Sequence, residues 1–99
     1  MSFDVSGFDW DDGNRMKCGK HGVPLAEIEQ ALRNDPLVLA DRTGSMETRF
    51  NAVGVNDQKR HVFVVFTLRD FGGRKLIRPL SARYMHAKEI KTYDRSKGS

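Results

Sequence analysis

The stretch of sequence that decides the fold is HVFVVFTLR, residues 61–69. In an extended chain, successive side chains point to opposite faces, and here both faces are apolar. Phe63 and Val65 lie on one face, and the other carries Val62, Val64, Phe66 and Leu68. Such a pattern is typical of a strand at the centre of a sheet that is covered on both sides. We therefore expect residues 61–69 to be a central strand with packed layers on both faces.

Strand and turn signals on either side of this stretch predict a β-meander. Residues 48–55 form a preceding strand, joined through a hairpin loop at residues 56–59. A turn at residues 70–73 contains two glycines and leads into a third strand over residues 75–83. Pro79 in that strand removes a backbone donor, so we expect an edge strand or a bulge there. Because the loops are short, the strands should be antiparallel neighbours.

Two helices are predicted before the meander. Residues 8–10 alternate apolar and polar side chains as a short strand does, and Asp12 then offers an N-cap for a helix over about residues 13–20. A second helix over residues 24–34 begins with proline as its first helical residue and carries one apolar stripe. Residues 37–40 then predict a short extended piece.

One more helix is predicted at the C-terminal end of the chain. Residues 86–94 carry apolar side chains spaced to pack on the sheet, namely Ala87, Ile90 and Tyr93. Residues 95–99 form a polar tail outside a core of about residues 8–94. The expected fold class is therefore α+β, with N-terminal helices, a small antiparallel β-meander and a C-terminal helix, in a single domain over residues 1–99.

Length and composition exclude several classes of protein. A chain of 99 residues is long enough for one compact domain, and with 38% hydrophobic and 30% charged residues it has globular rather than disordered composition. It contains no apolar run of the length that a membrane span needs. The single cysteine, Cys18, excludes an internal disulfide bond. Since residues 1–5 lack the features of a signal peptide, we expect a cytoplasmic protein without membrane association.

Charge divides the sequence into two unlike parts. Residues 1–58 hold six lysines and arginines against ten aspartates and glutamates, a net charge of −4. Residues 59–99 hold eleven lysines and arginines against three acids, a net charge of +8. A surface built from the second part would attract polyanions such as nucleic acid. The alternative is a solvated basic face balanced by an acidic lobe.

Arginines are concentrated on the predicted strands. Arg49, Arg69 and Arg83 occur at strand starts or ends, and Arg78 lies within the third strand. Guanidinium groups gathered on a small sheet repel one another unless carboxylates or phosphates neutralise them, and the planar guanidinium fork suits phosphate. We therefore expect these arginines to converge on one anion site. For each one, the alternative is an ion pair with an acid such as Glu47, Asp41 or Asp70.

The chain also carries side chains suited to acid–base chemistry on RNA. Cleavage of RNA without a metal requires a base for the 2′-hydroxyl group, cations for the phosphorane and an acid for the leaving oxygen. His21 could serve as acid or base, or it could instead cap the end of a helix. Tyr93 could contribute too, although a core position is the alternative. The three histidines are widely spaced, so we expect no metal site and no cofactor.

Several short motifs, taken in order, resemble one known family. They are Phe8-Asp9-Trp10-Asp11, Lys20-His21-Gly22-Val23, Asp35-Pro36, Glu47-Thr48-Arg49, Gly54, Thr67-Leu68-Arg69, Ser81-Ala82-Arg83 and Tyr93-Asp94. This order over about residues 8–94 resembles the BrnT family of type II toxins. The resemblance implies a RelE-like fold and a ribonuclease that arrests translation and growth. It also implies neutralisation by a BrnA-like ribbon-helix-helix antitoxin, with operator DNA bound only through the toxin–antitoxin complex.

The resemblance also suggests site residues. Its candidates for the active site are Lys20, His21, Glu47, Arg49, Arg69 and Arg83. For RNA binding, the basic character of the second half adds Lys75, Arg78, Lys88 and Lys91. The segment Arg78-Pro79-Leu80 departs from the isoleucine-rich run that the family carries before Ser-Ala-Arg, which predicts a local distortion near Arg83.

Three functions stay open on the sequence. The first is an endoribonuclease toxin that needs no metal ion. The second is a non-catalytic RNA-binding or ribosome-binding module, which would use the same basic half without cleaving RNA. The third is an interaction protein whose basic face docks an acidic partner.

Overall fold

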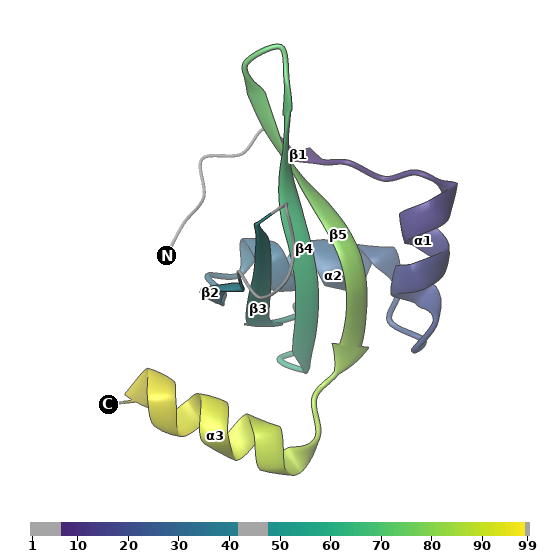
Figure 1. Ribbon diagram of the computed structural model, residues 1–99. Helices are drawn as coiled ribbons and strands as arrows, with labels where there is room; N and C mark the ends of the chain where they lie inside the picture. Colours follow the sequence, from purple (N-terminus) through teal and green to yellow (C-terminus); the bar gives the residue numbers. More distant parts are fainter. Residues whose placement is uncertain (1–6, 42–47, 99) are drawn as a thin grey trace.

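A five-stranded sheet with helices on one face forms the body of the protein (Figure 1). The structure is a computed structural model that describes residues 7–41 and 48–98, with side chains described for residues 7–40 and 48–92. The elements in chain order are β1 (Gly7–Phe8), α1 (Asp12–Gly19), α2 (Leu25–Arg33), β2 (Leu37–Asp41), β3 (Arg49–Val55), β4 (His61–Phe71), β5 (Arg74–Tyr84) and α3 (Ala87–Gly98). The α+β class predicted from the sequence is confirmed.

The strand order is β1-β5-β4-β3-β2. Strands β3 to β5 form the antiparallel meander that the turn signals predict, and β2 adds a fourth antiparallel strand to it. The short extended piece predicted at residues 37–40 is β2, at the edge of the sheet. β1 differs, because it pairs in parallel with β5 through Gly7 and Phe8. The sheet is therefore mixed and not purely antiparallel. Short loops do not constrain β1, since both α1 and α2 and three strands separate it in sequence from its partner.

Pro79 marks a bulge in β5, one of the two outcomes expected there. Val65 pairs with Ser81 and Phe66 pairs with Pro79, so Leu80 is an extra residue on β5. β5 is flanked by β4 along its length and by β1 at Leu76 and Ile77. The bulge restores the hydrogen-bonding register around a residue that cannot donate, and it lies four residues before Arg83.

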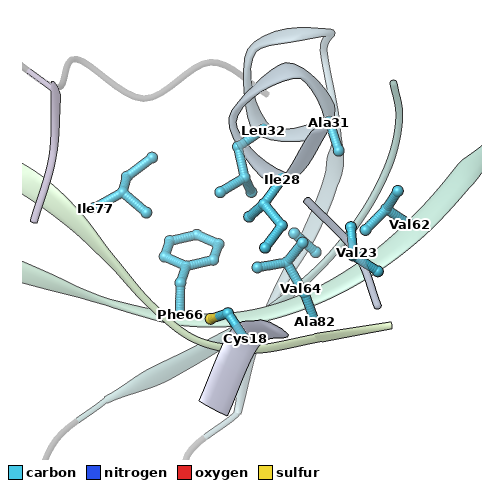
Figure 2. Packing of buried hydrophobic residues seen from close by; sticks show 11 residues of the cluster. Cys18, Val23, Ile28, Ala31, Leu32, Val62, Val64, Phe66, Ile77 and Ala82 are labelled. Atoms are coloured by element: carbon cyan, nitrogen blue, oxygen red, sulfur yellow. The ribbon is translucent and has the colours of Figure 1, made fainter. Parts of the chain in front are cut away.

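The hydrophobic core lies between α1, α2 and one face of the sheet. The even-numbered residues of β4 point into it, and its members are Cys18, Val23, Ile28, Ala31, Leu32, Ala52, Val62, Val64, Phe66, Ile77 and Ala82 (Figure 2). Helix α2 lies so close to β3 that a Cβ atom at Gly54 would overlap the carbonyl oxygen of Ala31. The apolar stripe predicted for α2 is the surface that it buries.

The opposite face of the sheet is not covered in the same way. Phe63 and Val65 are only half-buried, whereas Val62 and Val64 are fully buried. β4 is the central strand, as predicted, but among the described residues its second face is buried only at Thr67, so the expected cover on both sides is incomplete. We call the side of β2–β5 that points away from α1 and α2 the open face.

Helix α3 was expected to pack on the sheet. It begins at Ala87 and continues to Gly98, four residues beyond the predicted end. Figure 1 shows α3 beyond the C-terminal end of β5, where it runs away from that strand. Ala87 is exposed and Ile90 is half-buried, so Ala87 does not make the predicted contact. The side chain of Tyr93 lies outside the described residues.

The start of α1 is fixed by a capping box. Asp11, and not Asp12 as predicted, is the N-cap residue, because its carboxylate accepts from the backbone N–H of Asn14 at 3.0 Å. The Asn14 side chain returns the contact by accepting from the Asp11 N–H at 2.7 Å, and its Nδ2 donates to the Pro79 carbonyl oxygen at 2.9 Å. Pro24, predicted as the first helical residue of α2, is instead its N-cap, so α2 begins one residue later than expected. These contacts join α1 to β5.

A polar cluster fastens α2 to the opposite end of the sheet. One oxygen of Glu27 accepts from the Asn56 side chain at 2.7 Å and from the Tyr84 hydroxyl group at 2.8 Å. Asn56 is buried and closes the β3–β4 turn by accepting from the backbone N–H of Arg60. The hydrogen bond to Glu27 raises the pKa of Tyr84, with desolvation as the second cause. No helix in the described part of the chain is long and apolar enough to span a membrane.

Candidate functional site

The open face brings Arg49, Arg69 and Arg83 onto the same side of three adjacent strands. Arg83 lies directly opposite Phe63, and Arg69 is six residues further along β4, so both point to the face opposite the core. In β3 the pairing of Phe50 with Phe66 on the core side puts Arg49 on the open side. This shared face follows from the register: odd residues of β3 pair with odd residues of β4, and Arg83 lies after the bulge in β5, where odd residues again pair with odd residues of β4.

The three arginines form a track and not one tight pocket. Six residues along β4 correspond to roughly 20 Å between the row of Arg83 and Arg69. Arg49, at the start of β3, lies between these two rows along the strand direction. Arg49 and Arg69 are exposed, while Arg83 is half-buried. An extended polyanion could contact all three, whereas a single phosphate could not.

Arg83 is held in place by α3. Its two terminal nitrogens donate to the two carboxylate oxygens of Glu89, each at 2.7 Å, and the Glu89 Oε1 also accepts from the His86 N–H at 3.0 Å. The guanidinium carbon lies 4.9 Å from the centre of the Phe63 ring. The hydrogen bond to Glu89 raises the pKa of Arg83, and the hydrogen bonds from Arg83 and from the His86 N–H lower the pKa of Glu89 to about 2. The guanidinium is thereby oriented over the open face.

Arg78 has a different setting, at the edge where β1 and α1 meet β5. It donates to Asp9 at 3.3 Å and forms an ion pair with Asp11 at 2.8 Å. The hydrogen bond from Arg78 is the main cause that lowers the pKa of Asp11, and the same contact raises the pKa of Arg78. Because Asp11 also caps α1, this arginine is part of the contact that joins α1 to the sheet.

The other predicted residues lie apart from the arginine track or outside the described chain. Lys20 is the C-cap residue of α1, and His21 is exposed in the turn that follows, so both belong to the helix layer. Glu47 lies outside the described residues. The remaining basic candidates are exposed, with one at the start of β5 and two on α3; they are Lys75, Lys88 and Lys91.

Two residues on this side of the molecule were missed by the sequence analysis. Glu89, the partner of Arg83, lies three residues after His86, the residue before α3. A glutamate three residues after an N-cap is the spacing of a capping box, and this signal could have identified Glu89 from the sequence. His61 shares the open face with Phe63 and is half-buried. The alternation of residues along β4 would have placed it there.

The chemistry available on the open face is anion binding by permanent cations. Arginine cannot exchange its proton under ordinary conditions, so it can stabilise a phosphorane but cannot act as a general acid or base. Among residues 7–40 and 48–92, no three histidine, cysteine or acidic side chains are grouped as metal ligands. Burial raises the pKa of the Cys18 thiol to about 11, which makes it a poor nucleophile.

Comparison with known proteins adds one finding to this geometry. Residues 10–89 match the model of a family described as "Ribonuclease toxin, BrnT, of type II toxin-antitoxin system". The match spans α1 to the start of α3, including Arg49, Arg69, Arg83 and Glu89. A search of curated proteins gave no match.

Proposed function

Because the chain belongs to the BrnT family of ribonuclease toxins of type II toxin–antitoxin systems, we propose that it cleaves RNA on the open face of its sheet. In the proposed reaction, the 2′-hydroxyl oxygen attacks the adjacent phosphorus and the bond to the 5′ oxygen of the next nucleotide breaks. The hydroxyl proton goes to a general base, and a general acid protonates the leaving oxygen. We propose that no metal ion takes part.

The observation that carries this proposal is the common side of Arg49, Arg69 and Arg83 on three adjacent strands. The guanidinium groups of Arg49 and Arg69 can each donate two parallel hydrogen bonds to phosphate oxygens. Arg83 already donates from both terminal nitrogens to Glu89, so it would use its remaining N–H groups. One of the three guanidinium groups, beside the scissile phosphate, would stabilise the charge that develops in the phosphorane, and the others would hold flanking phosphates. Glu89 supports this role, since it fixes the direction of the Arg83 guanidinium.

The proton transfers are assigned to the remaining candidates. Lys20, His21 and Glu47 are the candidates that the family resemblance supplies. Because Lys20 and His21 lie in the helix layer, His61, which lies on the open face itself, is the candidate that the geometry favours. Imidazole is suited to proton transfer near neutral pH. Loss of cleavage in His61→Asn with unchanged RNA affinity would assign His61 to this role, and the same comparison applies to His21→Asn.

The partner proposed for the toxin is a BrnA-like ribbon-helix-helix antitoxin, with operator DNA bound only by the complex. Lys75, Arg78, Lys88 and Lys91 are proposed to contact RNA outside the reacting centre. For Arg78 this would require the guanidinium to reach RNA while it stays paired with Asp9 and Asp11. We propose that the protein acts in the cytoplasm.

The direct test is cleavage of RNA in the presence of EDTA by the purified protein and two double variants. Arg49→Ala/Arg83→Ala should lose about 100-fold or more in cleavage rate, because transition-state donors are removed. Arg15→Ala/Lys17→Ala removes the same charge from exposed positions of α1 and should cleave normally. Equal activity of both variants would contradict the proposed site. Binding of RNA by the wild type without any product would favour the non-catalytic module instead.

A further inference from the structure

The β4–β5 hairpin projects beyond the rest of the sheet (Figure 1). β3 pairs with β4 as far as Phe66, and β1 pairs with β5 only at Leu76 and Ile77. The described strands therefore leave the segment 70–75 as a two-stranded ribbon. Its turn is tight, because Gly72 and Gly73 have φ angles of +57° and +87° and the Gly73 N–H donates to Asp70 at 3.1 Å. Both positive angles fit the hairpin turn that matches the twist of the strands.

The tip of this hairpin exposes an aromatic ring among cations. Phe71 is 54% exposed, although a phenylalanine gains free energy from burial. Arg74 lies directly opposite it across the turn, and Arg69 lies two residues before it on the same face of the ribbon. Lys75 is exposed on the other face, opposite Asp70. The strand register thus places one arginine across from Phe71 and another two residues before it on the same face.

The same face continues into the open face of the sheet. Phe63, Arg69 and Phe71 are all odd-numbered residues of β4, and β4 has no extra residue between them. From the row of Arg83 to Phe71 there are eight residues, or roughly 26 Å along the strand. The hairpin tip is therefore the far end of the arginine track and not a separate surface.

We propose that Phe71 stacks on an unpaired base of single-stranded RNA, while Arg74 contacts the neighbouring phosphate. This inference rests on the proposed function and adds a binding subsite at a distance from the reacting centre. A flat ring beside guanidinium groups matches a nucleotide, which offers a base for stacking and a phosphate for the cation. Bases within a duplex are stacked on one another and cannot reach the ring, so the subsite selects single strands.

The test measures binding of a fluorescent single-stranded RNA in which every 2′-hydroxyl group is methylated, so that it cannot be cleaved. Phe71→Ala should weaken binding by about 5-fold to 100-fold, which is the usual loss when a stacking ring is removed. Phe71→Tyr should restore it. Met16→Ala is the matched control, because Met16 is 78% exposed on α1 in the helix layer, and its binding should equal that of the wild type.

Salt dependence separates the ring from the cation. Arg74→Ala should reduce the slope of the logarithm of the binding constant against the logarithm of salt concentration by about 0.7, because one phosphate contact is lost. Phe71→Ala should leave that slope unchanged. In Phe71→Trp, fluorescence from the new indole should be quenched by the RNA, whereas the wild type, whose single tryptophan is Trp10, should show little change.

Two outcomes would overturn the inference, and they are distinct from failure of the proposed function. If Phe71→Ala and Phe71→Tyr both bind RNA as the wild type does, the subsite is wrong while RNA cleavage stands. If Phe71→Ala loses only the binding of an antitoxin protein, the ring belongs to a protein interface. A wild-type protein that neither binds nor cleaves RNA would contradict the proposed function as well.

Discussion

The two faces of the sheet are built from the same strands but have different roles. On the face covered by α1 and α2, the residues from β4 are Val62, Val64 and Phe66, and all three are fully buried. On the open face, Phe63 and Val65 are half-buried and Arg69 and Phe71 are exposed, whereas Thr67 is buried. Alternation along one strand therefore assigns stability to one face and leaves the other available for binding.

Charge makes the same contrast. The core face carries no arginine among the described strands, whereas the open face carries Arg49, Arg69 and Arg83. The partner of Arg83 comes from α3, beyond the end of β5, so that this cation is oriented by an element outside the sheet. Arg78 at the β1 edge is instead paired with acids from the start of the chain. On the open face an ion pair orients Arg83, whereas the core face is stabilised by apolar packing.

The largest expected difference between the two faces is in how much each contributes to the stability of the fold. Phe66→Ala should lower the free energy of unfolding by about 3–5 kcal/mol, because it leaves a cavity against α2 and removes the ring stacked 5.2 Å from that of Phe50. Phe63→Ala deletes the same side chain from the open face and should cost clearly less, since that ring is only half-buried. Urea unfolding of both variants provides the measurement. Equal losses would show that the open face is covered as tightly as the core.

These faces also show what the sequence could and could not predict. Strands β2 to β5, α2 and the bulge at Pro79 were predictable, because turn residues and periodicity are local signals. The parallel pairing of β1 was not, since two residues carry too little pattern to reveal a distant partner. The apolar run in β4 suggested two packed faces. The sequence does not distinguish a phenylalanine that is buried in a core from one that, like Phe63, is half-buried beneath an arginine.

For the candidate site, residue types were predictable and partners were not. Arg49, Arg69 and Arg83 stand out in the sequence, and their common face follows from strand register. The alternative to an anion site was pairing with an acid such as Asp41, Glu47 or Asp70. In the structure Arg83 pairs with Glu89, and Arg78 pairs with Asp9 and Asp11. Those pairings depend on where α1 and α3 meet β5, which is a property of the folded chain.

A smaller effect is expected on the pH dependence of stability, through the ion pair that orients Arg83 on the open face. The pKa of Glu89 is lowered from 4.5 to about 2, first by the hydrogen bond from Arg83. The folded protein therefore binds this proton less readily than the unfolded chain. The stabilisation from the pair should be complete above pH 4.5 and should be lost as the pH falls towards 2.

Glu89→Gln isolates this contribution. The wild type should lose more stability than Glu89→Gln between pH 5 and pH 2 in matched thermal denaturation experiments, because only the wild type gives up the ion pair. Parallel curves for the two proteins over that range would show that the Arg83–Glu89 pair does not stabilise the fold.

The central claim, that RNA lies on the open face, is tested most directly by hydroxyl-radical footprinting of side chains with and without methylated single-stranded RNA. The account predicts that oxidation of Phe63 and Phe71 falls when RNA is bound, while oxidation of the exposed Met16 on α1 does not change. Protection of Met16 with unchanged oxidation of Phe63 and Phe71 would place the RNA on the helix layer and contradict the account.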